Sequence, residues 1–306
     1  MKQIIKRGGF LTLMFMLLGC LSLYAADNDL ITEQITIQLD KAGTLPARIA
    51  SSKKYKITNL KIIGEINGTD LRMIREMAGR DYRGNSTDGK LSVLDLSEAK
   101  IVKGGDSYYN DYNDNDYYTS NDVIGSEAFR ACSGLTSLTL PAGITSIGSY
   151  AFESCSGLTS LTLPAGITKI DFYTFRDCRG LTSLTLPASI TSIGFGAFDG
   201  CSGLTSIYVY AEKVPKGRNV FVGVDAKKCT LYVSKGTRND YCASDFGNYI
   251  ENIVEFDATG IDKITTSTDV EEVARYSVNG QRLSAPTKGL NIVKYSDGSV
   301  KKVAVR

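Results

Sequence analysis

The sequence predicts an α/β solenoid, a coiled chain whose short strands stack side by side into a parallel β-sheet. From Ser126 to Val209 one unit recurs every 23 residues, a period typical of solenoid proteins. Within each unit leucines alternate with serine or threonine, which is the pattern of a half-buried strand. Only the polar positions vary between units, so we expect the apolar positions to stack into a continuous core.

The repeated positions form columns down the sequence. They are Phe129, Phe152, Phe175 and Phe198; Cys132, Cys155, Cys178 and Cys201; Leu135, Leu158, Leu181 and Leu204; Leu138, Leu161, Leu184 and Ile207; Leu140, Leu163, Leu186 and Val209; and Pro141, Pro164 and Pro187. Proline has no N–H for a ladder and therefore ends each strand. Ile144 and Ile147 predict a second short apolar edge. The Ala151-Phe152 pair predicts a helical turn or short helix that ends near Cys155.

The pattern LxxLxLPxxIxxIxxxAFxxC resembles the BspA-like (Treponema pallidum-type) leucine-rich repeats of bacterial surface proteins. The resemblance is specific in three full units and extends more loosely from about residue 30 to residue 256. It implies a right-handed leucine-rich-repeat coil that is secreted or displayed on the cell surface and binds other macromolecules, often host proteins. It implies no catalytic residues and no cofactor.

The composition excludes several function classes. The chain of 306 residues has a formal net charge of +2, which gives little support to nucleic-acid binding. It contains no histidine, so Ser–His–Asp and Cys–His catalysis and histidine-based metal sites are excluded. No pair of carboxylates has the arrangement that a glycosidase needs. We therefore expect a protein that is not an enzyme.

Residues 1–25 predict an export signal. Lys2, Lys6 and Arg7 precede an apolar core from Phe10 to Leu23, and small residues follow at the predicted cleavage site near Ala25. The apolar run is too short for a membrane span. In an alternative interpretation, Leu17-Leu18-Gly19-Cys20 is a lipobox and Cys20 carries a lipid anchor. Either interpretation places the protein outside the cytoplasm, on the cell surface, in the outer membrane or secreted.

Residues 26–90 predict an N-terminal cap. Ile35, Ile37 and Leu39 alternate with polar residues as in an edge strand. Thr69 is placed to cap a helix whose end is marked by Gly79. A solenoid needs such caps because its terminal apolar edges would otherwise face water.

Residues 91–256 predict the repeats, interrupted by an insertion at 104–122. Leu94 and Leu138 lie 44 residues apart, 21 more than one unit, and the insertion has no hydrophobic periodicity. We therefore expect a surface loop. It contains five tyrosines among Asp, Asn and Ser: Tyr108, Tyr109, Tyr112, Tyr117 and Tyr118. Tyrosine among small polar residues is favoured at binding surfaces, so these five are candidate ligand contacts.

Two alternatives to a contact loop stay open for this insertion. It can be a solvated insertion without a ligand. It can also hold calcium, since Asp111, Asn113, Asn115 and Asp122 lie at offsets found in calcium loops. Against calcium, Asp116 stands where such a loop needs its turn glycine.

After Val209 the repeats degrade. Leu231-Tyr232-Val233 and Ile253-Val254 predict the last coils and a C-terminal cap, and residues 257–270 predict a linker. Asn279-Gly280 and Asp297-Gly298 predict turns in a small β tail at 271–306. This tail is similar to the C-terminal sorting domains of type IX secretion, although it is shorter than a full domain. An accessory hairpin without a sorting role is the alternative.

The cysteine column predicts small buried core residues, because cysteines one coil apart form a line and cannot converge on a metal. If a disulfide forms, Cys229–Cys242 is the favoured pair.

The outward positions predict an exposed Ser/Thr face, which β-branched strand preference explains. This face lacks the aromatic anchors of a binding hot spot. Further candidate contacts are therefore Tyr208, Tyr210 and Tyr232, where the repeats lose their threonines.

The sequence leaves two function classes. The first is adhesion to host or matrix proteins through the repeat sheet and the insertion. The second is a glycan-binding component of a surface uptake system.

Overall fold

The structure, a computed structural model, describes residues 30–256 with their side chains and, in the tail, the backbone of four strands. Two units, 1–258 and 259–306, are described here one by one. The predicted export signal, with Cys20, and the predicted linker at 257–270 lie outside the described residues. Among the described residues, no helix has the length and apolar character that crossing a membrane requires.

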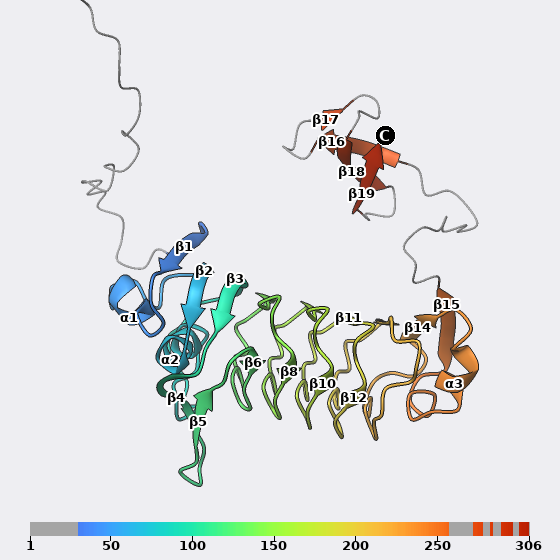
Figure 1. Cartoon of the computed structure of the whole chain (residues 1–306), viewed down its shortest axis with the longest axis horizontal. Coiled ribbons are helices and arrows are strands. Elements are labelled where there is room, and N and C mark those ends of the chain that lie inside the picture. Colours follow the sequence, from blue (N-terminus) through green and yellow to red (C-terminus); the bar gives the residue numbers. More distant parts are fainter. Residues whose placement is uncertain (1–29, 257–271, 278–281, 284–288, 296–299, 306) are drawn as a thin grey trace, which may run out of the picture. The chain divides into compact units, whose positions relative to one another are not determined.

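The main sheet of the first unit contains nine parallel strands (Figure 1). In spatial order they are β1 (Ile35–Leu39), β2 (Asn59–Ile66), β3 (Val93–Ile101), β7 (Ser137–Thr139), β9 (Ser160–Thr162), β11 (Ser183–Leu186), β13 (Ser206–Val209), β14 (Thr230–Ser234) and β15 (Asn252–Phe256). Their spatial order follows the sequence, so each coil adds one strand beside the previous one. Leu138 pairs with Leu161, which shows that the period of the repeat sets the register.

A second, smaller parallel sheet forms another side of the coil. Its strands are β6 (Val123–Ile124), β8 (Ser146–Ile147), β10 (Lys169–Ile170) and β12 (Ser192–Ile193). Each of these strands ends in a buried isoleucine. The second apolar edge that Ile144 and Ile147 predict is therefore confirmed, and both side chains are fully buried.

The third side of each coil consists of turns, so of the predicted helical turn or short helix at Ala151-Phe152 a turn forms and a helix does not. The reason is the destination of the backbone hydrogen bonds. The N–H groups of Tyr150, Phe152 and Ser154 donate to carbonyl oxygens of the next coil, whereas helical N–H groups would donate four residues back. Hydrogen bonds between coils therefore replace those within a helix.

The core of the solenoid is a stack of aromatic rings. Phe129, Phe152, Phe175, Phe198 and Phe221 are fully buried. Neighbouring rings of this column lie 5.1–5.4 Å apart, centroid to centroid. Phe246 meets the last ring edge-on at 5.3 Å. It lies after α3 (Arg238–Cys242), in the segment that leads to β15. The final coils thus cover the end of the stack.

At the N-terminal end, α1 (Leu45–Arg48) and α2 (Gly68–Met77) pack against the first strands. The predicted N-cap, Thr69, is wrong by two residues, because Asn67 caps α2. The Asn67 side chain accepts a hydrogen bond from the N–H of Thr69, and the Asp70 carboxylate accepts one from the N–H of Asn67. The Thr69 hydroxyl instead exchanges hydrogen bonds with Asp106 of the insertion. Gly79 lies just past the helix with φ +99°, as the predicted helix end requires.

The insertion is a β-hairpin, so the prediction of a surface loop is wrong. Strands β4 (Gly104–Asn110) and β5 (Asp116–Thr119) pair antiparallel, and the hairpin projects from the N-terminal end of the solenoid beside α2 (Figure 1). Tyr108 and Tyr109 lie in the core. Sequence periodicity does not reveal this, because the surface that buries them belongs to α2 and the first coil.

The second unit is a four-stranded antiparallel sheet in the order β17-β16-β18-β19. Its strands are β16 (Glu272–Ser277), β17 (Arg282–Leu283), β18 (Gly289–Tyr295) and β19 (Val300–Val305). The two predicted strand pairs correspond to β16–β17 and β18–β19. The predicted turns at 279–280 and 297–298 lie outside the described residues.

The ring stack predicts that alanine substitution of two nearby phenylalanines lowers the free energy of unfolding by very different amounts. Phe175→Ala opens a cavity between two rings and should lower the free energy of unfolding by about 3–5 kcal/mol. Phe172→Ala is the matched control, because Phe172 is 55% exposed, and it should change this free energy by less than about 0.5 kcal/mol. Urea unfolding followed by circular dichroism measures both. Equal losses would contradict the stack as the main source of stability.

Candidate functional site

The outer face of the main sheet changes character along the solenoid. At the centre, the outward positions of β7, β9 and β11 are the predicted serines and threonines, and they are at least partly exposed. The register places Thr139, Thr162, Thr185, Tyr208, Tyr232 and Val254 in one row. This row therefore changes from threonine to large side chains at the C-terminal end.

Three predicted contact residues meet at this end. The rings of Tyr208 and Tyr232 stack at 4.6 Å with an angle of 8° between their planes. Phe256 contacts Tyr210 edge-on at 5.0 Å and Tyr208 at 6.1 Å. All four rings are partly exposed, and we refer to them as the aromatic cluster. Sequence reasoning missed Phe256, although it lies three residues after Ile253 in the predicted cap.

The pairing of the strands fixes the position of the cluster. Tyr208 and Tyr232 are direct neighbours in the ladder between β13 and β14, where aromatic pairs stabilise a sheet. Burial and the two neighbouring phenols raise the pKa of Tyr208, so its hydroxyl stays neutral at physiological pH. The cluster thus presents apolar ring edges and neutral hydroxyl groups in one fixed arrangement.

For two hairpin tyrosines, the prediction of ligand contact is wrong because their side chains are buried. Tyr108 and Tyr109 are 1% and 3% exposed, so they are not available to a ligand. The Tyr108 hydroxyl donates to the carbonyl oxygen of Ser126 at 2.7 Å, and the Arg75 guanidinium lies 4.8 Å from the centre of the Tyr109 ring. Both side chains anchor the hairpin to α2 and the first coil.

The other hairpin tyrosines differ in exposure. Tyr117 is partly buried and packs against Tyr109 at 5.7 Å, whereas Tyr112 is 93% and Tyr118 is 55% exposed. Only Tyr112 and Tyr118 present large free surfaces. The β4–β5 hairpin that carries them lies at the N-terminal end of the solenoid, at the opposite end from β14 and β15 (Figure 1). The structure therefore separates the predicted contacts into two groups.

Three of the residues that suggested calcium, Asp111, Asn113 and Asn115, belong to the hairpin turn, whereas Asp122 lies between β5 and β6 (Val123–Ile124). Asp111 accepts hydrogen bonds from the N–H groups of Asn113 and Asn115 at 2.8 and 3.0 Å. Its second carboxylate oxygen accepts one from the Asn115 side chain at 3.0 Å. Within the part of the chain that the structure describes, no group of three or more acidic or cysteine side chains could hold a metal ion.

Sequence reasoning missed a second surface, on the turn side of the coils. Phe172 and Phe195 are 55% and 37% exposed. The Tyr173 ring meets Phe195 edge-on at 5.5 Å and stacks on Tyr150 at 5.5 Å. The Arg176 guanidinium lies 5.3 Å from the centre of the Tyr173 ring. Arginine and aromatic side chains together are typical of binding hot spots.

One column beside this surface alternates in charge. Arg130, Glu153, Arg176 and Asp199 occupy equivalent positions of successive units. Their charged groups approach to 2.7, 3.5 and 3.7 Å in that order. Arg130 and Glu153 also line a hollow of about 250 Å³ beside the exposed Tyr112 of the hairpin. The signal was present in the sequence, since the repeat varies at this polar position with alternating sign.

The predicted cysteine column is a line of buried thiols. Each Sγ of Cys155, Cys178 and Cys201 donates to a phenylalanine carbonyl oxygen at 3.0–3.1 Å. Burial raises the pKa of each of these thiols. Cys229 and Cys242, the favoured disulfide pair, are both free, and Cys229 is buried whereas Cys242 is exposed.

The thiols predict selective alkylation. In a chain carrying Cys20→Ser, iodoacetamide at about pH 8 should modify Cys242 rapidly and leave the column unmodified, because only thiolates react and burial disfavours them. Mass spectrometry of tryptic peptides measures each site. Adding Cys242→Ser should abolish fast labelling, and fast labelling of the column in the native protein would contradict the burial.

Glu127 predicts a pH dependence. Burial raises the pKa of its carboxyl to about 7, although Arg130 opposes the shift. The folded state therefore binds the proton more tightly than the unfolded state, and this stabilisation is lost as the pH rises from the unfolded value of 4.5 through about 7. The chain has no histidine, so no other side chain has an ordinary pKa in this window.

Thermal unfolding midpoints between about pH 5 and about pH 7.5 test this. The wild-type midpoint should fall as the pH rises, and that of Glu127→Gln should fall much less. Parallel curves for the two proteins would show that Glu127 does not titrate there.

The comparisons with known proteins agree with this architecture. Residues 109–242 match the model of the BspA type leucine rich repeat region in six copies. No curated protein matches the chain.

Several solved structures resemble it. The Treponema pallidum leucine-rich repeat protein is 26% identical, with a TM-score of 0.32, over 36% of this chain and 51% of that chain. A leucine-rich repeat protein from Bacteroides capillosus is 26% identical, with a TM-score of 0.26, over 33% and 70%. The pneumococcal vaccine antigen PcpA is 15% identical, with a TM-score of 0.34, over 68% and 61%. This chain thus spans about half the length of the T. pallidum protein.

The six matched copies include the regular repeats, Ser126 to Val209, and lie within the parallel coil that runs from β1 to β15. Residues 109–242 are therefore similar to the BspA type leucine rich repeat region.

Proposed function

We propose that this protein is an exported bacterial binding protein that attaches to host or matrix proteins. The observation that carries the proposal is the aromatic cluster at the end of a sheet face that is otherwise serine and threonine. The export context rests on the signal predicted from residues 1–25. The exposed hairpin tyrosines, Tyr112 and Tyr118, are a second contact region at the other end.

The physical argument concerns the cost of binding. Association loses the conformational freedom of each side chain that becomes ordered at the interface. The stacked rings of Tyr208 and Tyr232 are already held in place, with Phe256 packed against Tyr208. Tyrosine also supplies a large contact area and a hydroxyl group from a single side chain. The cluster therefore has the composition and the preorganisation of a hot spot.

The geometry favours a protein over a glycan. A sugar ring stacks on a free aromatic face, but stacking in the sheet ladder covers one face of Tyr208 and one face of Tyr232. Their edges and hydroxyl groups remain for the ligand, and apolar edges suit the side chains of a protein surface. The glycan-binding alternative, a component of a surface uptake system, needs free ring faces elsewhere, and the exposed Tyr112 is the candidate that favours it.

The proposed mechanism is surface complementarity without covalent chemistry. The long parallel sheet offers a continuous binding surface of the kind that solenoid proteins use. On the turn side, the alternating ion pairs from Arg130 to Asp199 link successive coils. Neither the sheet face nor the turn side combines a nucleophile with a general base, as catalysis requires.

The double substitution Tyr208→Thr with Tyr232→Thr tests the proposal. It extends the threonine row of the repeat by two coils, so the fold should tolerate it. Binding to an immobilised matrix protein from a panel should weaken by about 30-fold or more, since losing one hot-spot residue costs about 2 kcal/mol or more. Surface plasmon resonance with the purified full chain measures the change.

Two controls separate the possible sites. Thr162→Ser lies in the same row at the centre of the sheet and should leave binding unchanged. Tyr112→Ser reports the contribution of the hairpin. Binding that survives the double substitution would exclude the aromatic cluster. Binding to a glycan array with no matrix-protein binding would move the protein to the alternative class.

A further inference from the structure

The sheet contains an open strand edge that the proposed function does not use. β3 pairs with β2 from Val93 to Asp95 and, after an irregularity in the register, from Glu98 to Ile101. On its other side it pairs with β7 only from Val93 to Asp95. Beyond Asp95, no strand among the described residues pairs with that edge. β3 therefore extends past the neighbouring coil by several residues.

The hydrogen bonds of β3 show which backbone groups face the open edge. The N–H of Val102 donates to the carbonyl oxygen of Ile66 in β2, whereas the carbonyl oxygen of Ile101 accepts from Asp122 on the opposite side. Successive residues of a strand direct their backbone groups to opposite neighbours. Ala99, two residues before Ile101, therefore directs both its N–H and its C=O away from β2. Lys100 directs its own groups toward β2.

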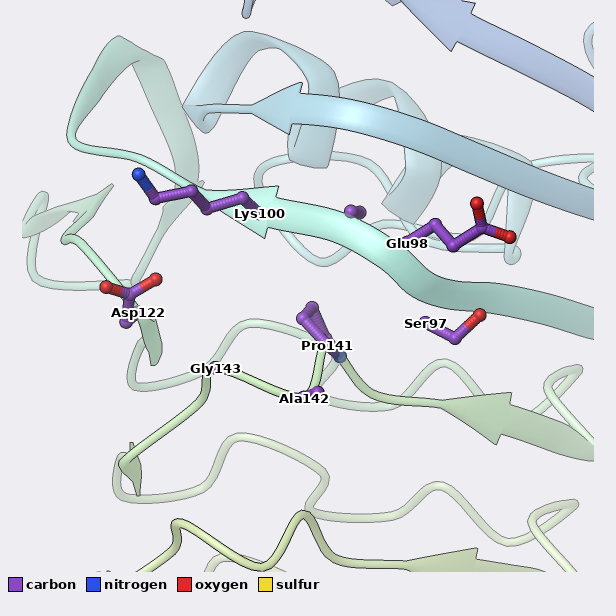
Figure 2. A pocket seen from close by; sticks show the side chains of 8 residues that line it. Ser97, Glu98, Lys100, Asp122, Pro141, Ala142 and Gly143 are labelled. Carbon is purple, nitrogen blue, oxygen red and sulfur yellow. The ribbon is translucent and has the colours of Figure 1, made fainter.

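A hollow lies along this edge. It has a volume of about 380 Å³, and residues 97–100, Asp122 and the turn 141–143 line it. Figure 2 shows Ser97, Glu98 and Lys100 on β3, with Pro141, Ala142 and Gly143 across the opening. Pro141 has no N–H to offer, so the facing turn cannot supply a regular ladder to Ala99. The chain thus leaves open the place that a strand would fill.

The charged side chains beside the open edge form ion pairs with the neighbouring strand β2. Glu98 is paired with Lys61 at 2.5 Å and Lys100 with Glu65 at 3.7 Å, so both pair with residues of β2. Both side chains are more than half exposed, and neither covers the edge. Between them, Ala99 has only a methyl group. Proteins commonly protect an open edge with bulky or charged inward side chains, and this edge lacks that protection.

We propose that the edge of β3 from Ser97 to Lys100 binds an extended segment of a partner protein as an added strand. The segment would pair with the N–H and C=O of Ala99, as in other cases of strand addition. Charge complementarity favours a segment with a basic residue beside Glu98 and an acidic residue beside Lys100. These two residues of the segment are two positions apart. A second copy of this chain fits less well, because its own 141–143 turn would meet the turn of the first copy.

This site lies in β3, whereas the aromatic cluster lies in β13–β15 (Figure 1). The two sites share no residue, so the strand-addition proposal does not depend on the adhesion proposal. Failure of one leaves the other standing.

The experiment uses the purified full chain and a synthetic peptide, acetyl-Thr-Lys-Val-Glu-Val-Thr-amide, with a fluorophore at one end. Fluorescence anisotropy measures its affinity, and amide hydrogen exchange locates it. The N–H of Ala99 should exchange rapidly in the free protein and slowly with saturating peptide. The amides of β13 should not change.

A matched pair of proline variants tests the orientation of the backbone. Ala99→Pro removes an N–H that faces the open edge, so the protein should keep its thermal midpoint while peptide affinity falls about tenfold or more. Lys100→Pro removes an N–H that faces β2 and should lower the thermal midpoint. The reverse pattern would overturn the assignment of the edge.

A variant with exchanged charges tests the proposal even if the proline variants do not fold. Glu98→Lys with Lys100→Glu should weaken binding of the peptide and favour one in which Lys and Glu are exchanged. The proposal is overturned if neither peptide binds at millimolar concentration, or if binding leaves the exchange of Ala99 unchanged. Concentration-dependent dimers that protect Ala99 would replace the partner segment with a second copy.

Discussion

The structure depends on hydrogen bonding and stacking between coils at a fixed period of 23 residues. Leu138 pairs with Leu161, and the phenylalanine rings stack at 5.1–5.4 Å. Cys155, Cys178 and Cys201 each donate to a phenylalanine carbonyl oxygen of the preceding coil. Because backbone donors on the turn side bond to the next coil, no coil satisfies its own polar groups alone. One residue gained or lost within a unit would shift every column at once. The long insertion is tolerated because it leaves the coil between β3 and β6, where it forms a hairpin of its own.

This constraint also decides where binding sites can lie. A perfectly repeated face presents the same small side chains in every coil and has no anchor for a partner. Features that a partner can recognise arise where the repetition fails. At one end, tyrosines replace threonines in β13 and β14. At the other end, β3 extends beyond the end of β7, so part of its edge has no paired strand. The central coils hold these two places at a fixed separation.

The sequence predicted the features that depend on local pattern and period. The strands, the second apolar edge and the buried cysteine column all follow from residues 23 positions apart. The hairpin could not be predicted in this way, because Tyr108 and Tyr109 are buried by Arg75 and Ser126, which lie far from them in the chain. Asn67 replaced Thr69 as the cap because the Thr69 hydroxyl bonds to Asp106 of the insertion. Phe256 joined the aromatic cluster only through the register of the sheet. Long-range contacts account for each of these differences.

The alternating column of Arg130, Glu153, Arg176 and Asp199 has a consequence for how such a chain can change its length. Duplication or loss of one unit would move one end of the solenoid relative to the other by about 4.8 Å. Loss of the unit that carries Glu153 would, however, place Arg130 beside Arg176, and like charges in adjacent positions are destabilising. Loss or gain of two units preserves the alternation. Descendants of this gene should therefore differ by even numbers of repeats in this segment, with end-to-end spacings that change in steps of about 10 Å.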